Sequence, residues 1–455
     1  MEIDGPYKYG VAPHTALYFS ASQRKVGKMW KLTFGVLLAA SLCYGLPTKN
    51  NNPNKFPVLK ETRKEVLYRV SEPSKPFLLE CVVLGNVPGV KYTWHKNGKP
   101  LAVEDLEVVQ RHEEGTLVFL RPKAEDAGEY QCFATTELGK ASTGVIHVKR
   151  AYINAKPAVL KELKPVEAKP LKLECNIPDA YPKPNITWRY QSVGDPEISS
   201  EVLDARMTFS PEGSLYITSV AKEDANRNFK YVCVARTPAS SKDLSLAEYV
   251  IEEVQPNDKK DGEIQEMYTS KDMTVKVGDR TFIYCIFGGF PQAYQDYYKD
   301  GEIINSKPGD RVTVYNRSKG KRLLIRDTYV TDAGTYKCVS SNKVGKPKEH
   351  TMKLTVVAAP HAVKMPPTVA NVAPGLDFTF HCSAEAVPAP KITWTYNAEP
   401  LTADSHFIIV ENTKGNLTTS DLTIKAAEEK NKGYYGCKVE NEHGVLYAET
   451  AFRVA

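Results

Sequence analysis

A Tyr that stands two residues before a Cys recurs four times along this chain of 455 residues. The copies are Tyr130 with Cys132, Tyr231 with Cys233, Tyr336 with Cys338, and Tyr435 with Cys437. Side chains alternate between the two faces of a β-strand, so a spacing of two places the Tyr and the Cys on one face. We therefore expect four strands that each bury a Tyr ring and a thiol in a core.

Each copy follows an earlier Cys and an aromatic ring at matched distances. The earlier cysteines are Cys81, Cys175, Cys285 and Cys382, which lie 51, 58, 53 and 55 residues before their partners. The rings stand 12 or 13 residues after these cysteines and are Trp94, Trp188, Tyr297 and Trp394. This order marks an immunoglobulin sandwich, in which the Tyr hydroxyl bonds back to the preceding corner. The sequence thus predicts an all-β chain of four tandem immunoglobulin-like (I-set) β-sandwich domains, each closed by one disulfide.

The length of the chain agrees with four cores, since 455 residues exceed the usual size of one domain. The predicted domains are residues 46–150, 151–254, 266–358 and 359–455, with a linker at 255–265. The linker is polar, contains Pro and Gly, and lacks the alternation of a strand. It spans roughly 35 Å when extended, which would let the second pair of domains fold back beside the first as a horseshoe.

The segment before the first domain, residues 1–45, is predicted to be an upstream extension and a signal peptide. Its apolar run at 32–43 is too short to span a bilayer, and Cys43 with the two residues after it resembles a cleavage site. Either Met29 is the working start, or Met1 begins an unusually long leader. We expect a secreted, extracellular protein with no membrane span. The secretory pathway is oxidising, so we expect the other eight Cys to form disulfides and Cys43 to be removed with the signal peptide.

Motifs for catalysis or cofactor binding are missing from the sequence. It has no His-Glu-x-x-His, no Gly-x-Ser-x-Gly, no phosphate loop and no dinucleotide signature. The nine His are scattered, and none pairs with a Cys at zinc-ligand spacing. A net charge of +6 is mild for a dedicated nucleic-acid binder. We expect no enzyme activity, no cofactor, no metal and no nucleic-acid partner.

Three Asn-x-Ser/Thr sequons predict glycosylation in a secreted chain. They begin at Asn185, Asn316 and Asn416. Counting by twos from the inward Trp188 places Asn185 on the outer face of its strand. The other two sequons fall in the turn before the apolar strand that leads to the corner, where we expect exposure. The alternative is that these sequons stay unoccupied.

Two groups of charged residues stand out in the third repeat. The densest basic cluster includes Lys319, Lys321 and Arg322. Alternate residues of a hairpin share a face, so we expect Lys319 and Lys321 to meet an anionic ligand together, with Arg322 beside them. The alternative is a solvated turn without a ligand. Arg311 and Asp332 resemble the ion pair that braces the corner in many such domains, which is a stability role.

Several local stretches are more specific than the repeat itself. They are Leu173-Glu-Cys175 with Tyr181-Pro-Lys-Pro184, Gly213-Ser-Leu-Tyr216 with Tyr231-Val-Cys233, Gly288-Gly with Lys299-Asp-Gly301, Gly433-Tyr-Tyr-Gly-Cys437, and Asn441-Glu-His-Gly444. Together they resemble the hemolins, immune proteins of moth haemolymph, over all four domains. More distantly, the chain is similar to the outer domains of neural cell-adhesion molecules such as neuroglian.

The resemblance implies a function as well as a fold. Hemolins are secreted into haemolymph, bind lipopolysaccharide and lipoteichoic acid on bacterial surfaces, bind haemocytes, modulate haemocyte aggregation and adhere to their own kind. Their four domains bend into a horseshoe. One departure is Tyr297, where the family's third domain carries Trp, and we expect only a smaller core ring there. The alternative function is a soluble homophilic adhesion module that recognises no glycolipid.

Overall fold

The computed structural model describes residues 56–455 except residues 72, 86, 104–106, 112, 203, 259–261, 315 and 317. The predicted signal peptide, with its apolar run at 32–43 and Cys43, lies outside the described residues. The described residues form strands and short 3-10 helices, so the all-β prediction is confirmed. None of these helices has the length and apolar character that crossing a membrane requires.

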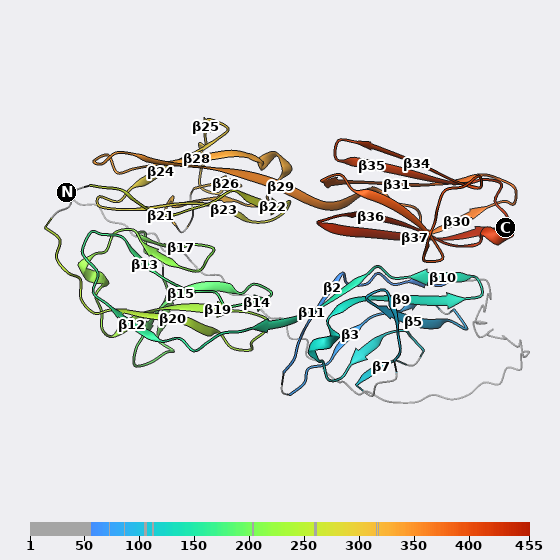
Figure 1. The fold of residues 1–455 in the computed structure, drawn as a ribbon, viewed down its shortest axis with the longest axis horizontal. Coiled ribbons are helices and arrows are strands. Elements are labelled where there is room, and N and C mark those ends of the chain that lie inside the picture. Colours follow the sequence, from blue (N-terminus) through green and yellow to red (C-terminus); the bar gives the residue numbers. More distant parts are fainter. Residues whose placement is uncertain are drawn as a thin grey trace, which may run out of the picture. The chain divides into compact units, whose positions relative to one another are not determined.

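Domains 1 and 2 are each built around two facing sheets, and domain 1 has a short two-stranded sheet in addition (Figure 1). The strands of domain 1 are β1 (Val58–Leu59), β2 (Glu65–Arg69), β3 (Phe77–Leu79), β4 (Val83–Leu84), β5 (Lys91–Lys96), β6 (Lys99–Leu101), β7 (Val108–Gln110), β8 (Leu117–Phe119), β9 (Gly128–Thr136), β10 (Gly139–Ser142) and β11 (Ile146–Ile153). Those of domain 2 are β12 (Leu160–Leu163), β13 (Leu171–Leu173), β14 (Ala180–Tyr181), β15 (Asn185–Ser192), β16 (Ser199–Glu201), β17 (Met207–Phe209), β18 (Leu215–Ile217), β19 (Phe229–Arg236) and β20 (Leu244–Ile251). In domain 1 the sheet β3-β8-β7 faces the sheet β11-β9-β5-β6, and in domain 2 the sheet β13-β18-β17 faces β12-β20-β19-β15-β16.

Domains 3 and 4 repeat this plan. The strands of domain 3 are β21 (Gln265–Thr269), β22 (Met273–Lys276), β23 (Thr281–Gly288), β24 (Tyr294–Lys299), β25 (Glu302–Ile303), β26 (Val312–Thr313), β27 (Arg322–Ile325), β28 (Gly334–Ser341) and β29 (Lys348–Lys364). Those of domain 4 are β30 (Val369–Val372), β31 (Phe378–Val387), β32 (Lys391–Tyr396), β33 (Glu399–Pro400), β34 (Phe407–Lys414), β35 (Leu417–Ile424), β36 (Gly433–Asn441) and β37 (Gly444–Val454). In domain 4 the sheet that contains β31, β35 and β34 faces the sheet β30-β37-β36-β32-β33.

A single strand runs across each of two domain boundaries. β11 pairs with β9 and β2 in domain 1 and then with β14 in domain 2. β29 pairs with β28 and β22 in domain 3 and then with β31 in domain 4. The boundary between domains 2 and 3 is different, because residues 255–265 leave one sheet at the bridge between Val166 and Gln255 and enter the next at β21.

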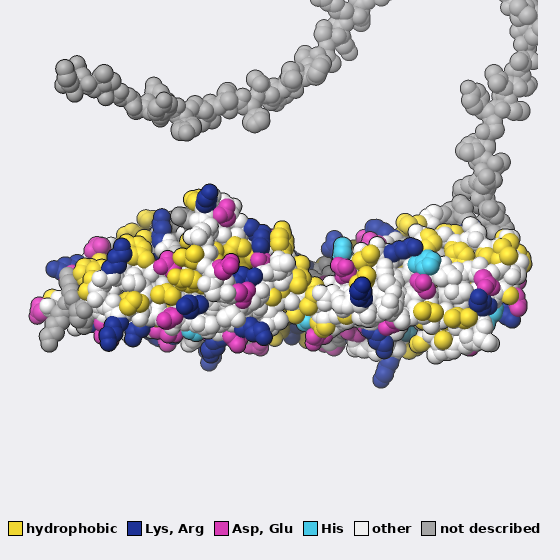
Figure 2. All heavy atoms as spheres, turned by 90° about the horizontal axis from the view of Figure 1, so that it is seen from above, with side chains coloured by type: hydrophobic (Ala, Val, Ile, Leu, Met, Phe, Trp, Pro, Cys, Tyr) yellow, Lys and Arg dark blue, Asp and Glu magenta, His cyan; other side chains and the backbone are white. Residues whose placement is uncertain are grey.

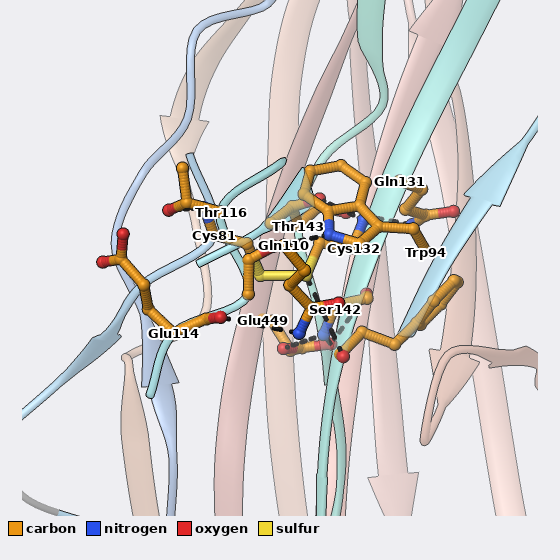
Figure 3. The surroundings of a disulfide bond; sticks show 12 residues. Cys81, Trp94, Gln110, Glu114, Thr116, Gln131, Cys132, Ser142, Thr143 and Glu449 are labelled. Carbon is orange, nitrogen blue, oxygen red and sulfur yellow. Dashed lines mark hydrogen bonds between the residues drawn. A yellow bond between two sulfur atoms is a disulfide. The ribbon is translucent and has the colours of Figure 1, made fainter. Parts of the chain in front are cut away.

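Each core is built around a disulfide and the ring beside it. The four disulfides join Cys81 to Cys132, Cys175 to Cys233, Cys285 to Cys338, and Cys382 to Cys437. In each domain the ring lies directly opposite the second Cys, as Trp94 does beside Cys132 (Figure 3). The ring's polar atom is satisfied as well, since Trp94 Nε1 donates to the backbone oxygen of Gly115 at 2.6 Å. Tyr297 fills the same position with its hydroxyl, which donates to the Gly320 oxygen at 3.1 Å.

The corner before each second Cys contains a single turn of 3-10 helix. These turns are Ala124–Asp126, Lys222–Asp224, Val330–Asp332 and Glu429–Asn431. The hydroxyls of Tyr130 and Tyr336 donate to the backbone oxygens of Asp126 and Asp332, both at 2.8 Å, as the tyrosine corner requires. Among the described residues Tyr231 makes no such bond, and domain 2 therefore closes its corner by other contacts.

Candidate functional site at the contacts between domains

The basic residues predicted to bind an anion do not share an open face. Lys319 is exposed in the turn before β27, whereas Lys321 is buried. Lys321 Nζ donates to the backbone oxygens of Ala205 in domain 2 at 2.5 Å and of Ser318 at 3.3 Å. The shared face predicted for Lys319, Lys321 and Arg322 is therefore wrong, because domain 2 covers the second lysine.

An aromatic cluster joins domain 2 to domain 3, and the Arg322 side chain packs against it. Tyr216 is buried although it lies on the outer face of β18, and its ring centroid is 5.9 Å from that of Tyr268 on β21. Tyr268 in turn lies 5.7 Å from Tyr284 on β23. The Arg322 guanidinium stacks 4.5 Å from the ring centroid of Phe282, a cation–π contact. Two of the three predicted ligand residues therefore take part in the packing of domain 3 on domain 2: Lys321 contacts Ala205, and the Arg322 guanidinium lies 5.9 Å from the Phe209 ring centroid.

Replacing Lys321 by Ala should weaken the contact between domains 2 and 3. The side chain of Lys321 is buried, and its ammonium group donates to two backbone oxygens. Burial also lowers the pKa of Lys321 to about 8. Losing the buried stem and both hydrogen bonds should cost about 2 kcal/mol of unfolding free energy. Lys319→Ala, in the same turn but exposed, should stay within about 0.5 kcal/mol. Denaturant titrations of the two variants give the comparison, and equal effects would contradict this role.

Domain 1 packs against domain 4 through a small apolar cluster. Phe56, Ala134 and Ala141 of domain 1 are buried together with Tyr434 and Ala451 of domain 4. The rings of Phe56 and Tyr434 meet edge to face with centroids 5.5 Å apart. The Tyr434 hydroxyl donates to the backbone oxygen of Pro57 at 2.6 Å, and so its polar end is satisfied across the contact.

A carboxylate of domain 4 stands at the polar centre of the same contact (Figure 3). Glu449 on β37 accepts hydrogen bonds from the Ser142 backbone N–H at 3.0 Å and from the Ser142 hydroxyl at 3.2 Å, both on β10 of domain 1. The hydroxyl of Tyr447 donates to the same carboxylate at 2.9 Å. Burial raises the pKa of Glu449 to about 7, although these hydrogen bonds act in the opposite direction.

Gly139 lets the surfaces of domains 1 and 4 approach this closely, and Gly436 leaves room within domain 4 for the Tyr447 hydroxyl. Gly139 has φ +142°, and a Cβ on it would lie 2.8 Å from Asn397 Oδ1 and 3.0 Å from the Tyr434 ring. A Cβ on Gly436 would lie 2.3 Å from the Tyr447 hydroxyl. Any larger residue at either position would force the two surfaces, or Tyr447, to move.

Ion pairs brace the corners of domains 2 and 3. The predicted pair of Arg311 and Asp332 is confirmed, with Nη1–Oδ2 at 2.7 Å and Nη2–Oδ1 at 2.8 Å. Burial would raise the pKa of Asp332, but the Arg311 bonds and the Tyr329 N–H outweigh it and the pKa is lowered. Domain 2 contains an equivalent pair that the sequence reading missed, in which Arg206 grips Asp224 at 2.8 and 2.9 Å.

A spacing in the sequence could have revealed Asp224, the acidic member of the missed pair. In every repeat the polar residue of the corner stands nine residues after the Leu that starts the preceding strand. The pairs are Leu117 with Asp126, Leu215 with Asp224, Leu323 with Asp332, and Leu422 with Asn431. The broken Asp-x-Gly-x-Tyr pattern of the second repeat hid this spacing, because its extra residues come after the Asp.

The three sequons differ in accessibility. Asn185 on β15 and Asn416 in the turn between β34 and β35 are exposed. Asn316 is only partly exposed, and its Nδ2, the atom that would carry a glycan, donates to the backbone oxygen of Arg322 at 2.8 Å. Its Oδ1 accepts from the hydroxyl of the buried Ser318 at 2.6 Å. The exposure predicted for Asn316 is therefore wrong, since its side chain organises the turn from within.

We expect glycans at Asn185 and Asn416 and none at Asn316. Glycan transfer requires a free amide nitrogen on an accessible side chain, and the fold engages that atom only at Asn316. Peptide mapping of the protein expressed in insect cells behind a known secretion signal, before and after treatment with peptide-N-glycosidase, gives the occupancy of each site. A glycan at Asn316 would show that the turn closes only after modification.

Charges of both signs are mixed over the surface. On the face shown in Figure 2, Lys and Arg side chains are interspersed with Asp and Glu. The mixture agrees with the net charge of +6 and with surface ion pairs such as Lys60 with Glu80, 3.1 Å apart. This face presents no broad basic field, so an anionic ligand would need a local site.

Comparisons with known proteins agree with the four-sandwich structure. Residues 266–356 and 360–454 match the immunoglobulin I-set domain family, and residues 57–136 match an immunoglobulin domain family. The chain is 48% identical over 402 residues to the hemolin of Lonomia obliqua, which covers 88% of this chain and 94% of the relative. It is 44% identical over 425 residues to the hemolin of Manduca sexta, covering 92% and 98%.

A solved structure and a longer relative complete the comparison. The crystal structure of the insect immune protein hemolin superimposes with a TM-score of 0.81 at 43% identity, covering 88% of this chain and 100% of that one. Neuroglian of Drosophila melanogaster is 33% identical over 441 residues, but the chain spans only 33% of its length. The resemblance seen in the sequence is therefore confirmed: the chain belongs to the hemolin family of immunoglobulin-superfamily proteins.

Proposed function

We propose that this chain is an extracellular haemolymph protein of innate immunity that binds bacterial surfaces through lipopolysaccharide and lipoteichoic acid, binds haemocytes and modulates their aggregation. Identity of 44–48% to three hemolins, over most of the chain, supports the immune role. The contacts of domain 2 with domain 3 and of domain 1 with domain 4 are those that a horseshoe bent at residues 255–265 would make. They support that bend as part of the proposal.

The observation that best supports an anionic glycolipid as ligand is a cavity where domain 1 meets domain 2. It measures about 410 Å³ and is lined by Arg69, Lys75, Leu67 and Phe77 of domain 1 and by Pro238 of domain 2. The described residues that line it include no Asp or Glu. Guanidinium and ammonium groups suit a phosphate, and apolar walls suit an acyl chain. A phosphorylated lipid head group fits this combination.

Binding to immobilised lipopolysaccharide and lipoteichoic acid tests the proposal and its site separately. We expect wild-type binding that weakens with added salt and falls about tenfold or more in Arg69→Ala/Lys75→Ala. Lys99→Ala/Arg121→Ala, which removes two exposed cations of the same domain, should bind like the wild type. A wild type that binds neither glycolipid, intact bacteria nor haemocytes would refute the function. Equal binding by the first variant would refute only the site.

A second candidate is a soluble homophilic adhesion module. The hemolin crystal structure is described as an arrangement with implications for homophilic adhesion, and neuroglian is a relative of this chain. The contact between domains 1 and 4 supports this candidate, because two chains could exchange it by opening and pairing domain 1 of one with domain 4 of the other. Concentration-dependent association in sedimentation experiments, without binding to either glycolipid, would favour this candidate over the first.

A further inference from the structure

The hydrogen bonds of Glu449 cross from one domain to the other and come from neutral groups. Two arrive from the backbone N–H and the hydroxyl of Ser142 in domain 1, and one from the Tyr447 hydroxyl. Tyr447 is itself 3.1 Å from the Ser142 hydroxyl and 3.4 Å from Thr395 Oγ1. A carboxylate removed from water is usually compensated by a cation, and the groups that hold this one carry no charge.

Charged and titratable groups on the surrounding strands have partners of their own. The Lys140 ammonium on β10 lies 3.9 Å from Glu399 on β33 and 4.3 Å from the Phe133 ring on β9. Arg453, on the same strand as Glu449, places its guanidinium 5.1 Å from the Phe56 ring. Further groups on the packed strands are Lys438, paired with Glu440 at 2.6 Å, Tyr434, whose hydroxyl donates to the Pro57 oxygen, and His95, whose ring lies 4.6 Å from that of Phe133.

We propose that Glu449 is a pH-sensitive latch between domains 1 and 4, which holds them together when the carboxyl group is protonated and releases them as it ionises. The protonated carboxyl can donate its hydrogen to Ser142 Oγ, 3.2 Å away, while its other oxygen still accepts the Ser142 N–H at 3.0 Å. Glu449 is only partly exposed in the closed contact, and separation of the domains exposes it further. The ionised carboxylate gains more from this added hydration than from three neutral donors.

The direction of the pH effect follows from the two states of the contact. In the closed contact the pKa of Glu449 is raised from its ordinary value of 4.5 to about 7. In the open form the carboxyl is hydrated and returns to its ordinary value. The closed contact therefore has its full stability below pH 4.5 and loses it as the pH rises to about 7 and beyond. These pKa values correspond to a fall of about 70-fold in the ratio of closed to open molecules between pH 5 and pH 8.

Hydrogen exchange at the Ser142 amide measures this equilibrium even when the open form is rare. That N–H is bonded to Glu449 itself, so it exchanges when the domains separate. In the full-length protein we expect its protection factor, corrected for the intrinsic pH dependence of exchange, to fall about 70-fold from pH 5 to pH 8. In Glu449→Gln, which keeps an acceptor but cannot ionise, we expect a protection factor that does not change with pH.

Three further variants make the result specific. Glu442→Gln removes an exposed carboxylate of domain 4, and His95→Gln removes the titratable ring near the contact, and both should keep the wild-type pH profile. Tyr447→Phe removes a hydrogen-bond donor that favours the ionised form of Glu449. In this variant the pH midpoint of the fall in the Ser142 protection factor should therefore move to higher pH. A pH-dependent protection factor that persists in Glu449→Gln would overturn the proposal, and so would a profile abolished by His95→Gln. A midpoint that stays in place or falls in Tyr447→Phe would do the same.

Discussion

Replacing Cys175 and Cys233 together by Ala should lower the free energy of unfolding of domain 2 by about 4 kcal/mol. The disulfide closes a loop of 58 residues, and the chain-entropy model gives a stabilisation of about this size for such a loop. The lost bond also lies at the centre of the core, beside Trp188. Hydrogen exchange of the amides of β15 and β19 across a denaturant series measures the loss.

The same experiment contains its own control. Core amides of β28 in domain 3 and β36 in domain 4 belong to sandwiches with their own disulfides and should keep their protection. Reduction of the wild-type protein should loosen all four domains together. A melting temperature that does not change under reductant would contradict the view that the disulfides close the cores.

Replacing Arg206 by Ala should cost about 3–5 kcal/mol, since it would leave the carboxylate of Asp224 buried without its cation. The side chains of Arg206 and Asp224 are 19% and 4% exposed, and the guanidinium donates one hydrogen bond to each carboxylate oxygen. Arg206 also donates to the backbone oxygen of Ser219 at 2.9 Å, which ties the start of β17 to the corner. Chemical denaturation of the variant gives the loss directly.

Two companion variants separate the ion pair from a general loss of charge. Arg227→Ala removes a guanidinium that is 69% exposed and 4.0 Å from Glu252, and should change stability by less than about 0.5 kcal/mol. Arg206→Ala/Asp224→Ala removes both partners and should recover part of the loss, because no charge stays buried alone. If the double variant were less stable than Arg206→Ala, the cost of the unpaired carboxylate would not be the cause.

Features that depend on local periodicity could be predicted from the sequence. The spacing of two between Tyr130 and Cys132 requires only that a strand alternates its faces, and the structure buries both residues on one face. The match of Tyr297 to the Trp positions follows from its distance to Cys285, and its hydroxyl takes over the bond of the indole. Four copies of one pattern made the fold class secure.

Contacts between domains could not be predicted in the same way. Alternation places Lys321 on the same face of its hairpin as the core residues Leu323 and Ile325, but it contains no information that the ammonium group reaches the backbone oxygen of Ala205 in another domain. Likewise, Glu449 is an ordinary outward residue of β37. Its pKa is raised by burial, although the hydrogen bonds from Ser142, 307 residues earlier in the chain, act in the opposite direction. The candidate site therefore depends on the packing of whole domains, which no local pattern in the sequence specifies.

Zero-length carbodiimide cross-linking tests the pairing of domains 1 and 4 most directly. Lys140 Nζ of domain 1 lies 3.9 Å from Glu399 Oε1 of domain 4, so the monomer should yield a peptide that joins these two residues. Lys60 with Glu80 in domain 1 and Lys425 with Asp377 in domain 4 are exposed pairs at 3.1 and 2.6 Å that calibrate the yield. We expect all three cross-links within one chain. Recovery of the two calibrating pairs without Lys140–Glu399 would contradict the account.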